Sequence, residues 1–228
     1  KPETAARLRQ RIEAVLDAAK AQGHRTGENP AAWRGHLSHL LPKRPTLAKG
    51  HHAAMAYADL PAFVEKLREH QARSVAAFAL EFLIVTAARS GEVYGARWSE
   101  IDLEAQVWTV PPERMKAGRE HRVPLCGRAV AILAEMAKVR TTDFVFPGRS
   151  AGRLSHIQMA KVMTRLGVAN ATPHGLRSAF RDWAGNETSF PREVAEAALA
   201  HSVGDEVERA YRRSAALEKR RALMEGWA

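Results

Sequence analysis

The 228-residue sequence lacks the features that mark secreted, membrane and metal-cluster proteins. Cys126 is the single cysteine, which excludes an internal disulfide and a multi-cysteine zinc site and fits a reducing cytoplasm. No stretch approaches the roughly 18 unbroken apolar residues that a membrane span needs. No basic-then-apolar signal peptide is present either. The sequence therefore predicts a cytoplasmic protein without a membrane partner.

Recognisable cofactor-binding motifs are missing as well. There is neither a glycine-rich phosphate loop of the Walker type nor a dinucleotide-binding fingerprint. His36 and His39, or His51 and His52, could in principle hold a metal ion. Neither pair has a cysteine or an acidic cluster at ligand spacing. We therefore predict no cofactor and no metal site.

What the sequence has in excess is positive charge. Thirty-five Lys and Arg residues against 25 Asp and Glu residues leave a formal net charge of +10. Such an excess indicates a polyanionic partner, most simply nucleic acid, although a basic protein without this partner has the same composition. The 46% hydrophobic fraction is ample for a packed core.

Periodicity divides the sequence into a small N-terminal element and a larger domain. Residues 3–21 are expected to form one amphipathic helix. Its apolar face consists of Leu8, Ile12, Val15, Leu16 and Ala19. Glycine and proline break up residues 22–52, which hold a short helix around 31–41 and the natural domain boundary. We expect residues 1–50 to precede a domain of residues 51–228, and the chain to be a fragment of a longer protein.

The larger domain is expected to be mainly α with a small antiparallel β-sheet near its middle, an α+β fold. Asp59 is expected to cap a helix, and residues 74–88 to form a buried one. Strands are predicted at 107–110 and 121–125, with 144–146 as a third. Further helices are expected at residues 155–166, from Thr172 with Pro173 at the first position, and at 191–199, 205–214 and 215–226.

Arg89 lies where the buried helix ends. Ser90 and Gly91 allow a turn and are expected to cap the next helix, with Glu92 in its first turn. Arg89 could satisfy helix-end carbonyls. Alternatively, supported by Glu92, it could contact a phosphate, because a guanidinium matches two phosphate oxygens.

His174 and Arg177 are three residues apart and therefore share a helix face, on which Arg181 also falls. The apolar residues of this helix fall on the opposite face. The His–x–x–Arg pair is thus expected to project away from the packing stripe. A solvated polar face explains this pattern as well as a functional site does.

Lys116 lies in the charged loop that joins the first two predicted strands. A charge run in a hairpin is usually a solvated turn. A loop lysine could also enter a cleft and give a proton to a leaving oxygen, because burial and nearby charge shift its pKa.

Tyr211 follows His201 by ten residues near the end of the chain. A lone tyrosine on a helix is usually a packing residue. A phenol with a pKa of about 10 becomes a nucleophile only beside cations and a base. His174, His201, Arg89 and Arg177 would supply both if they converge.

Several of these motifs, in this order, resemble the catalytic domain of the tyrosine recombinases, and specifically of prophage and genomic-island integrases. The resemblance runs from about Tyr57 to the C-terminus. It is carried by TAARSGE (86–92), ARWSEID (96–102), RMK (114–116), HRVPL (121–125), HGLR (174–177), LAH (199–201), AYRR (210–213) and RRALMEGWA (220–228).

The resemblance implies a DNA breaking-rejoining fold and a role for each matching residue. Arg89 and Arg177 would clamp the scissile phosphate, with Glu92 orienting Arg89. Lys116 would protonate the departing 5′ oxygen and His174 would serve in proton transfer. His201 would brace the phosphate, and Tyr211 would attack it. The implied product is a covalent 3′-phosphotyrosine intermediate, formed without metal or other cofactor.

The family also implies partners. These are double-stranded DNA attachment sites, a tetramer on DNA with a monomeric isolated fragment, and host DNA-bending and excision accessory proteins at the bacterial nucleoid. The family's arm-binding domain and most of its core-binding domain are absent, so residues 1–50 are expected to be the last core-binding helix plus a linker. Contacts to DNA are expected from Lys43, Arg44, Lys49, Arg119 and Arg181. The alternatives are a type IB topoisomerase-like nicking-closing enzyme and a DNA-binding module with an idle catalytic set.

Overall fold

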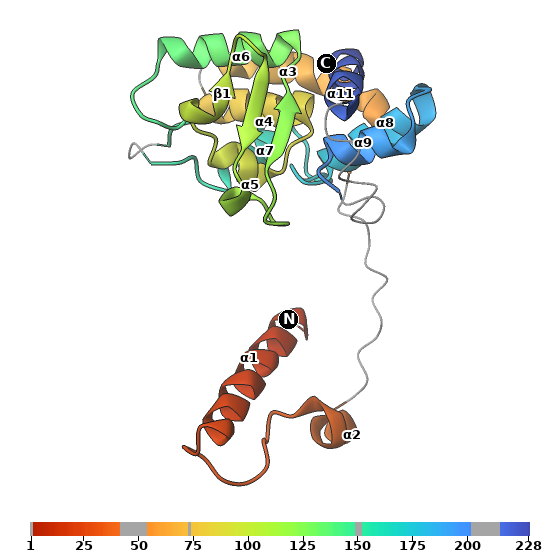
Figure 1. Cartoon of the computed structure of the whole chain (residues 1–228). Helices are drawn as coiled ribbons and strands as arrows, with labels where there is room; N and C mark the ends of the chain where they lie inside the picture. Colours follow the sequence, from red (N-terminus) through yellow and green to blue (C-terminus); the bar gives the residue numbers. More distant parts are fainter. Residues whose placement is uncertain (1, 42–53, 73, 149–151, 202–214) are drawn as a thin grey trace. The chain divides into compact units, whose positions relative to one another are not determined.

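The structure, a computed structural model, describes residues 2–41, 54–72, 74–148, 152–201 and 215–228 (Figure 1). Two compact units divide the chain, residues 1–50 and 51–228. None of the described helices is long and apolar enough to cross a membrane.

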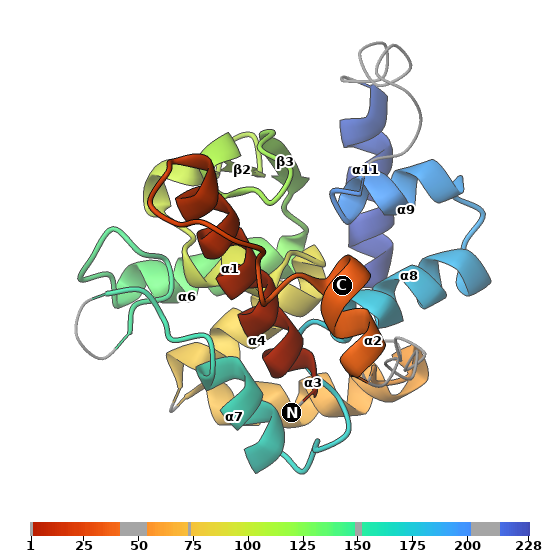
Figure 2. The ribbon, with the colours of Figure 1, turned by 90° about the horizontal axis from the view of Figure 1, so that it is seen from below.

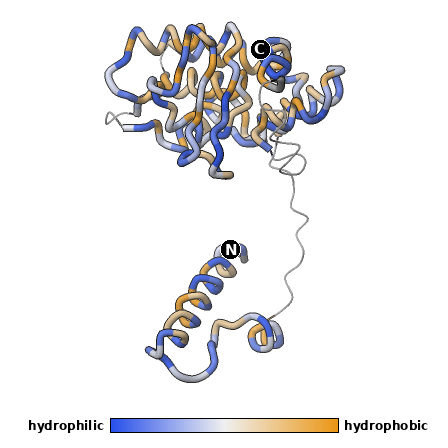
Figure 3. The backbone as a smooth tube through the Cα atoms, in the orientation of Figure 1, coloured by the Kyte–Doolittle hydropathy of each residue, from blue (hydrophilic) through white to orange (hydrophobic). Residues whose placement is uncertain are grey.

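The N-terminal unit consists of one long helix and a returning segment. The predicted helix is present as α1 (Pro2–Ala21), along which hydrophobic and hydrophilic residues alternate (Figure 3). Asn29 ties the returning segment to α1, because its Nδ2 donates to the Glu13 carbonyl at 2.9 Å and to Asp17 Oδ1 at 2.7 Å. Much of the predicted apolar face is exposed, including Val15 at 67%.

The short helix expected around residues 31–41 is divided. A π-turn, η1 (Trp33–Leu37), is followed by α2 (Ser38–Leu40). Regular helical geometry is interrupted inside η1, where Gly35 has a φ of +72° that a right-handed helix does not allow.

In the larger unit, α4 (Val75–Thr86) is the central helix, as the nearly unbroken apolar run predicts. Because it has no polar, solvent-exposed face, it is surrounded by α3 (Leu60–Gln71), α6 (Gly127–Lys138) and α7 (Gln158–Arg165). The predicted capping by Asp59 is wrong: this residue belongs to a 3-10 turn, η2 (Tyr57–Asp59), and its side chain makes no capping hydrogen bond.

The sheet is antiparallel with the order β1-β2-β3. The two predicted strands are present as β2 (Val107–Val110) and β3 (His121–Pro124), with η3 (Trp98–Glu100) before the sheet and η4 (Pro112–Arg114) between these strands. Trp108 of β2 packs on Phe82 of α4, with ring centroids 5.4 Å apart, so one sheet face is joined to the central helix.

The third strand was predicted in the wrong place. It is β1 (Ile101–Asp102), which is too short to show an alternating pattern. Residues 144–146 form only an isolated bridge from Phe144 to Arg97. Val145 and Phe146 are buried, so this apolar triplet fills the core and does not extend a ladder.

The remaining helices are α5 (Ser90–Tyr94), α8 (Leu176–Glu187), α9 (Arg192–Ala198) and α11 (Ala215–Trp227). Both α8 and α11 lie beside α9 (Figure 2). The helix start predicted at Thr172 is too early: Thr172 Oγ1 accepts the Gly175 N–H at 3.0 Å in a preceding turn, and α8 itself begins at Leu176 with Gly175 at its N-cap. The segment 155–166 becomes regular at Gln158, and the helix predicted at 205–214 lies outside the described residues.

Candidate active site

Two helix ends meet at the candidate site, and each carries a left-handed alanine. Ala87 follows α4 with φ +49°, and Ala200 follows α9 with φ +52°. A left-handed conformation costs a residue with a Cβ about 1–2 kcal/mol, so the surrounding contacts must hold these turns. The carbonyls at helix C-termini carry partial negative charge and therefore attract cations.

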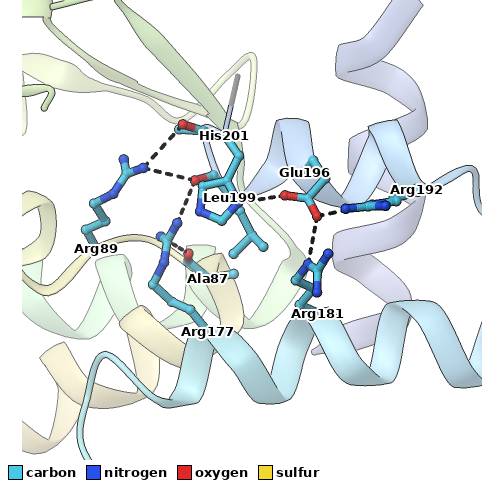
Figure 4. Close-up of polar contacts among 9 residues, drawn as sticks. Ala87, Arg89, Arg177, Arg181, Arg192, Glu196, Leu199 and His201 are labelled. Carbon is cyan, nitrogen blue, oxygen red and sulfur yellow. Dashed lines mark hydrogen bonds and ion pairs between the residues drawn. The ribbon is translucent and has the colours of Figure 1, made fainter. Parts of the chain in front are cut away.

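Arg177 joins the two helix ends. It is 5% exposed, and its guanidinium donates to the carbonyls of Ala87 and Leu199 (Figure 4). Burial, and next the charge of Arg89, lower its pKa to about 10, so Arg177 stays charged at neutral pH. A solvated polar face does not describe this position, because Arg177 is buried against α9 and the end of α4.

Arg89 reaches the same place from the start of α5. Its Nη2 lies 3.4 Å from the Leu199 oxygen and 3.2 Å from the Ala200 oxygen. Glu92 accepts from both the Nη1 and the backbone N–H of Arg89, each at 2.8 Å. Arg89 itself therefore occupies the capping position expected for Ser90, and a buried carboxylate holds its guanidinium. The side chain remains 22% exposed, which leaves a face for a ligand.

His201 lies directly beyond the carbonyls that the two arginines contact. Its Nδ1 is 2.6 Å from Glu196 Oε2, and the side chain is 44% exposed (Figure 4). Glu196 Oε1 accepts from Arg181 Nε at 2.7 Å and lies 3.6 Å from Arg192 Nε. Burial alone would raise the pKa of Glu196, but the hydrogen bonds from Arg181 and His201 outweigh it and hold that pKa below its ordinary value.

The other predicted site residues are less closely joined. His174 is exposed at the turn before α8, and its carbonyl accepts the Arg177 N–H at 3.2 Å. Lys116 and Arg119 are exposed in the loop between β2 and β3, and the described contacts do not join Lys116 to the arginine pair. Arg181 is half-exposed with its Nε bound to Glu196.

Four predicted residues lie outside the described part of the chain. They are Lys43, Arg44, Lys49 and Tyr211.

Besides Glu196, the sequence analysis missed His121, a neighbour of the arginine pair, and Arg220, a neighbour of His121. His121 begins β3 and hydrogen-bonds to the backbone of Ala198. Burial, followed by the charge of Arg220, lowers the pKa of His121 to about 3, so it is a neutral imidazole among guanidiniums. Arg220 of α11 is 8% exposed and donates to the Arg122 carbonyl at 2.7 Å. The one local signal was the position of His121 inside a recognised strand motif.

The arrangement presents fixed positive charge. Among the described residues no group of three or more His, Cys, Asp or Glu side chains is placed to hold a metal ion. The two guanidiniums share the Leu199 carbonyl, the Glu92 carboxylate holds that of Arg89, and the His201 imidazole lies beside them. Such a group suits a phosphate whose charge increases during reaction.

Comparison with known proteins places most of the chain in one family. Residues 54–218 match the phage integrase family, and residues 1–36 match the phage integrase central domain. Prophage integrase IntA of Escherichia coli K12 is 42% identical over 149 residues, 64% of this chain and 36% of that protein. Prophage integrase IntZ of the same strain is 34% identical over 230 residues, 100% of this chain and 55% of that protein. The chain thus spans about half the length of these relatives or less.

Solved structures share the fold. A lambda integrase dimer bound to a COC′ core site superposes with a TM-score of 0.62 at 18% identity, covering 88% of this chain and 72% of that one. A lambda integrase tetramer bound to a Holliday junction gives 0.62 at 19% identity, covering 90% and 60%. The expected fold class, that of the tyrosine recombinase catalytic domains, is confirmed. The chain belongs to the phage integrase family.

Proposed function

We propose that this chain is the catalytic part of a site-specific DNA recombinase that integrates or excises a prophage or genomic island. The observation that carries the proposal is the convergence of Arg89, Arg177 and His201 around the end of α9, in a chain of the phage integrase family. Fixed guanidiniums stabilise the transition state more than the ground state, because in-line attack concentrates charge on the phosphate oxygens.

The proposed reaction exchanges one phosphodiester for another. The Tyr211 oxygen attacks the phosphorus, forming a 3′-phosphotyrosine ester as the bond to the 5′ oxygen breaks. His174 accepts the tyrosine proton, and Lys116 gives a proton to the leaving 5′ oxygen. A 5′ hydroxyl from another strand then reverses the step. Because the ester bonds are of similar energy, the reaction consumes no nucleotide.

The partners belong to the same proposal. The central-domain match supports residues 1–50 as the end of a core-binding domain plus linker. Lambda integrase has been solved as a dimer and as a tetramer on DNA, which supports double-stranded attachment sites and a tetramer as partners here. DNA backbone contacts from Lys43, Arg44, Lys49, Arg119 and the exposed part of Arg181 are part of the proposal. The proposal also includes host DNA-bending and excision accessory proteins as partners, and action at the bacterial nucleoid.

The test is a nicked suicide duplex carrying the junction at the end of the integrated element that encodes the chain, resolved on a denaturing gel. We expect a covalent protein–DNA adduct in the presence of a chelator, and none with Tyr211→Phe. An adduct that persists in Tyr211→Phe, an absolute requirement for divalent metal, or no adduct on any junction would each contradict the proposal. Bound but uncleaved DNA would indicate a binding module with an idle catalytic set.

A further inference from the structure

We propose that Glu196 is a positioning residue that holds the His201 proton on Nδ1 and leaves Nε2 as the nitrogen that meets the phosphate. Its consequence for catalysis rests on the function proposed above. The Glu196–His201 contact itself is a property of the folded chain and can be tested without DNA.

The end of α9 brings the two residues together. The His201 N–H donates to the Glu196 carbonyl at 2.9 Å, and the Ala200 N–H donates to the Ala197 carbonyl at 3.1 Å. With Ala200 in the left-handed conformation, this pattern is a Schellman motif. Two contacts therefore join Glu196 and His201: the backbone hydrogen bond and the 2.6 Å contact between their side chains.

The chemistry of the contact assigns the proton. An ionised carboxylate only accepts hydrogen bonds, so Nδ1 must donate to Oε2. Glu196 is well suited to stay ionised, because Arg181 donates to its other oxygen, and the hydrogen bonds from Arg181 and His201 outweigh the effect of burial. A histidine with its proton fixed on Nδ1 presents Nε2 outward, unprotonated in the neutral ring and as a donor in the imidazolium.

The two oxygens of the Glu196 carboxylate bind different partners, so the substitution Glu196→Gln affects them differently. Oε1 serves the guanidiniums, and Oε2 serves His201. In Glu196→Gln the amide oxygen must face Arg181, because Arg181 Nε is a donor. The amide NH₂ then faces Nδ1, which has to accept a hydrogen bond, so the His201 proton moves to Nε2. The substitution is isosteric, and a purely structural role predicts no such proton shift.

The first measurement is the His201 tautomer, from two-bond ¹H–¹⁵N correlation spectra of the chain labelled with ¹⁵N-histidine and assigned with His201→Gln. We expect the Nδ1–H form in the wild type and the Nε2–H form in Glu196→Gln. Glu193→Gln is the matched control, because it makes the same change at an exposed position of α9 and should leave the spectrum unchanged. An unchanged tautomer in Glu196→Gln, or Nε2–H in the wild type, would overturn the proposal.

The second measurement links the tautomer to the reaction. On the suicide duplex, Glu196→Gln should lower the cleavage rate by about 10- to 100-fold with unchanged DNA affinity, as supporting residues of a reactive histidine do. The same substitution should have little further effect in a His201→Gln background. An equal loss in both backgrounds would contradict action through His201. If no adduct forms with any variant, the proposed function fails while the spectra still decide the tautomer.

Discussion

Arg89 and Arg177 donate to the same carbonyl oxygen, that of Leu199. Two like charges are brought together because helix-end carbonyls and the Glu92 carboxylate offset their repulsion. The protein thereby builds a cationic site in advance of any phosphate, and the cost of assembling it is met during folding.

Replacing Arg177 by lysine tests the double contact. Lysine keeps the charge but lacks the fork that reaches Ala87 and Leu199 together. We expect Arg177→Lys to lower the free energy of unfolding by about 1–3 kcal/mol, measured by urea denaturation, because a buried carbonyl loses its donor. Arg165→Lys, at an exposed position of α7, is the control. Equal effects of the two substitutions would show that Arg177 does not join the helix ends.

The left-handed alanines predict a stabilising change. Ala200→Gly removes the Cβ clash at φ +52° and should raise the free energy of unfolding by about 0.5–1 kcal/mol after the extra chain entropy of glycine is subtracted. Ala87→Gly should behave alike. Ala197→Gly, inside α9, should instead destabilise by about 1 kcal/mol. Thermal and urea unfolding of the three variants measures these changes. A lower free energy of unfolding at both left-handed positions would refute backbone strain at Ala87 and Ala200.

His121 predicts how stability depends on pH. Its folded-state pKa of about 3 lies below the ordinary 6.5. Between these values the unfolded chain binds a proton that the folded chain does not, so stability falls as pH falls below 6.5. His121→Asn should flatten the pH dependence of unfolding free energy between pH 7 and 5, and the exposed control His156→Asn should keep it. Parallel curves for wild type and His121→Asn would contradict the buried neutral imidazole.

Glu81 is a buried carboxylate whose replacement should destabilise the larger unit. Its carboxylate in α4 is fully buried and accepts from Arg68 at 2.7 Å and from Arg128 at 2.6 Å. Arg68 and Arg128 are 45% and 29% exposed, so Glu81→Gln leaves no buried unpaired charge, and weakening of the charged hydrogen bonds should cost about 1–3 kcal/mol in urea denaturation. Glu135→Gln, in a surface pair with Lys138, should change stability by less than about 0.5 kcal/mol. Similar values for the two would rule out a special role for the buried cluster.

Local pattern was sufficient for the elements whose signal lies within one segment. The apolar run of α4, the period of α1 and the strands β2 and β3 were all predictable in this way. Prediction failed where the signal was too short or ambiguous. The two residues of β1 are too few to show the alternating pattern of a strand. The apolar triplet 144–146 has the same pattern in a core loop as in a strand.

The sequence by itself determined the order and identity of the proposed catalytic side chains, and with them the family. The tertiary structure decided which of these side chains meet and in what state. Arg177 is buried because α9 and the end of α4 close over it, which no helix-face rule could show. Glu196 reaches His201 because a left-handed Ala200 reverses the chain at the end of α9. Such contacts depend on backbone turns and on packing between distant segments, and neither is encoded in the spacing of residues along one helix.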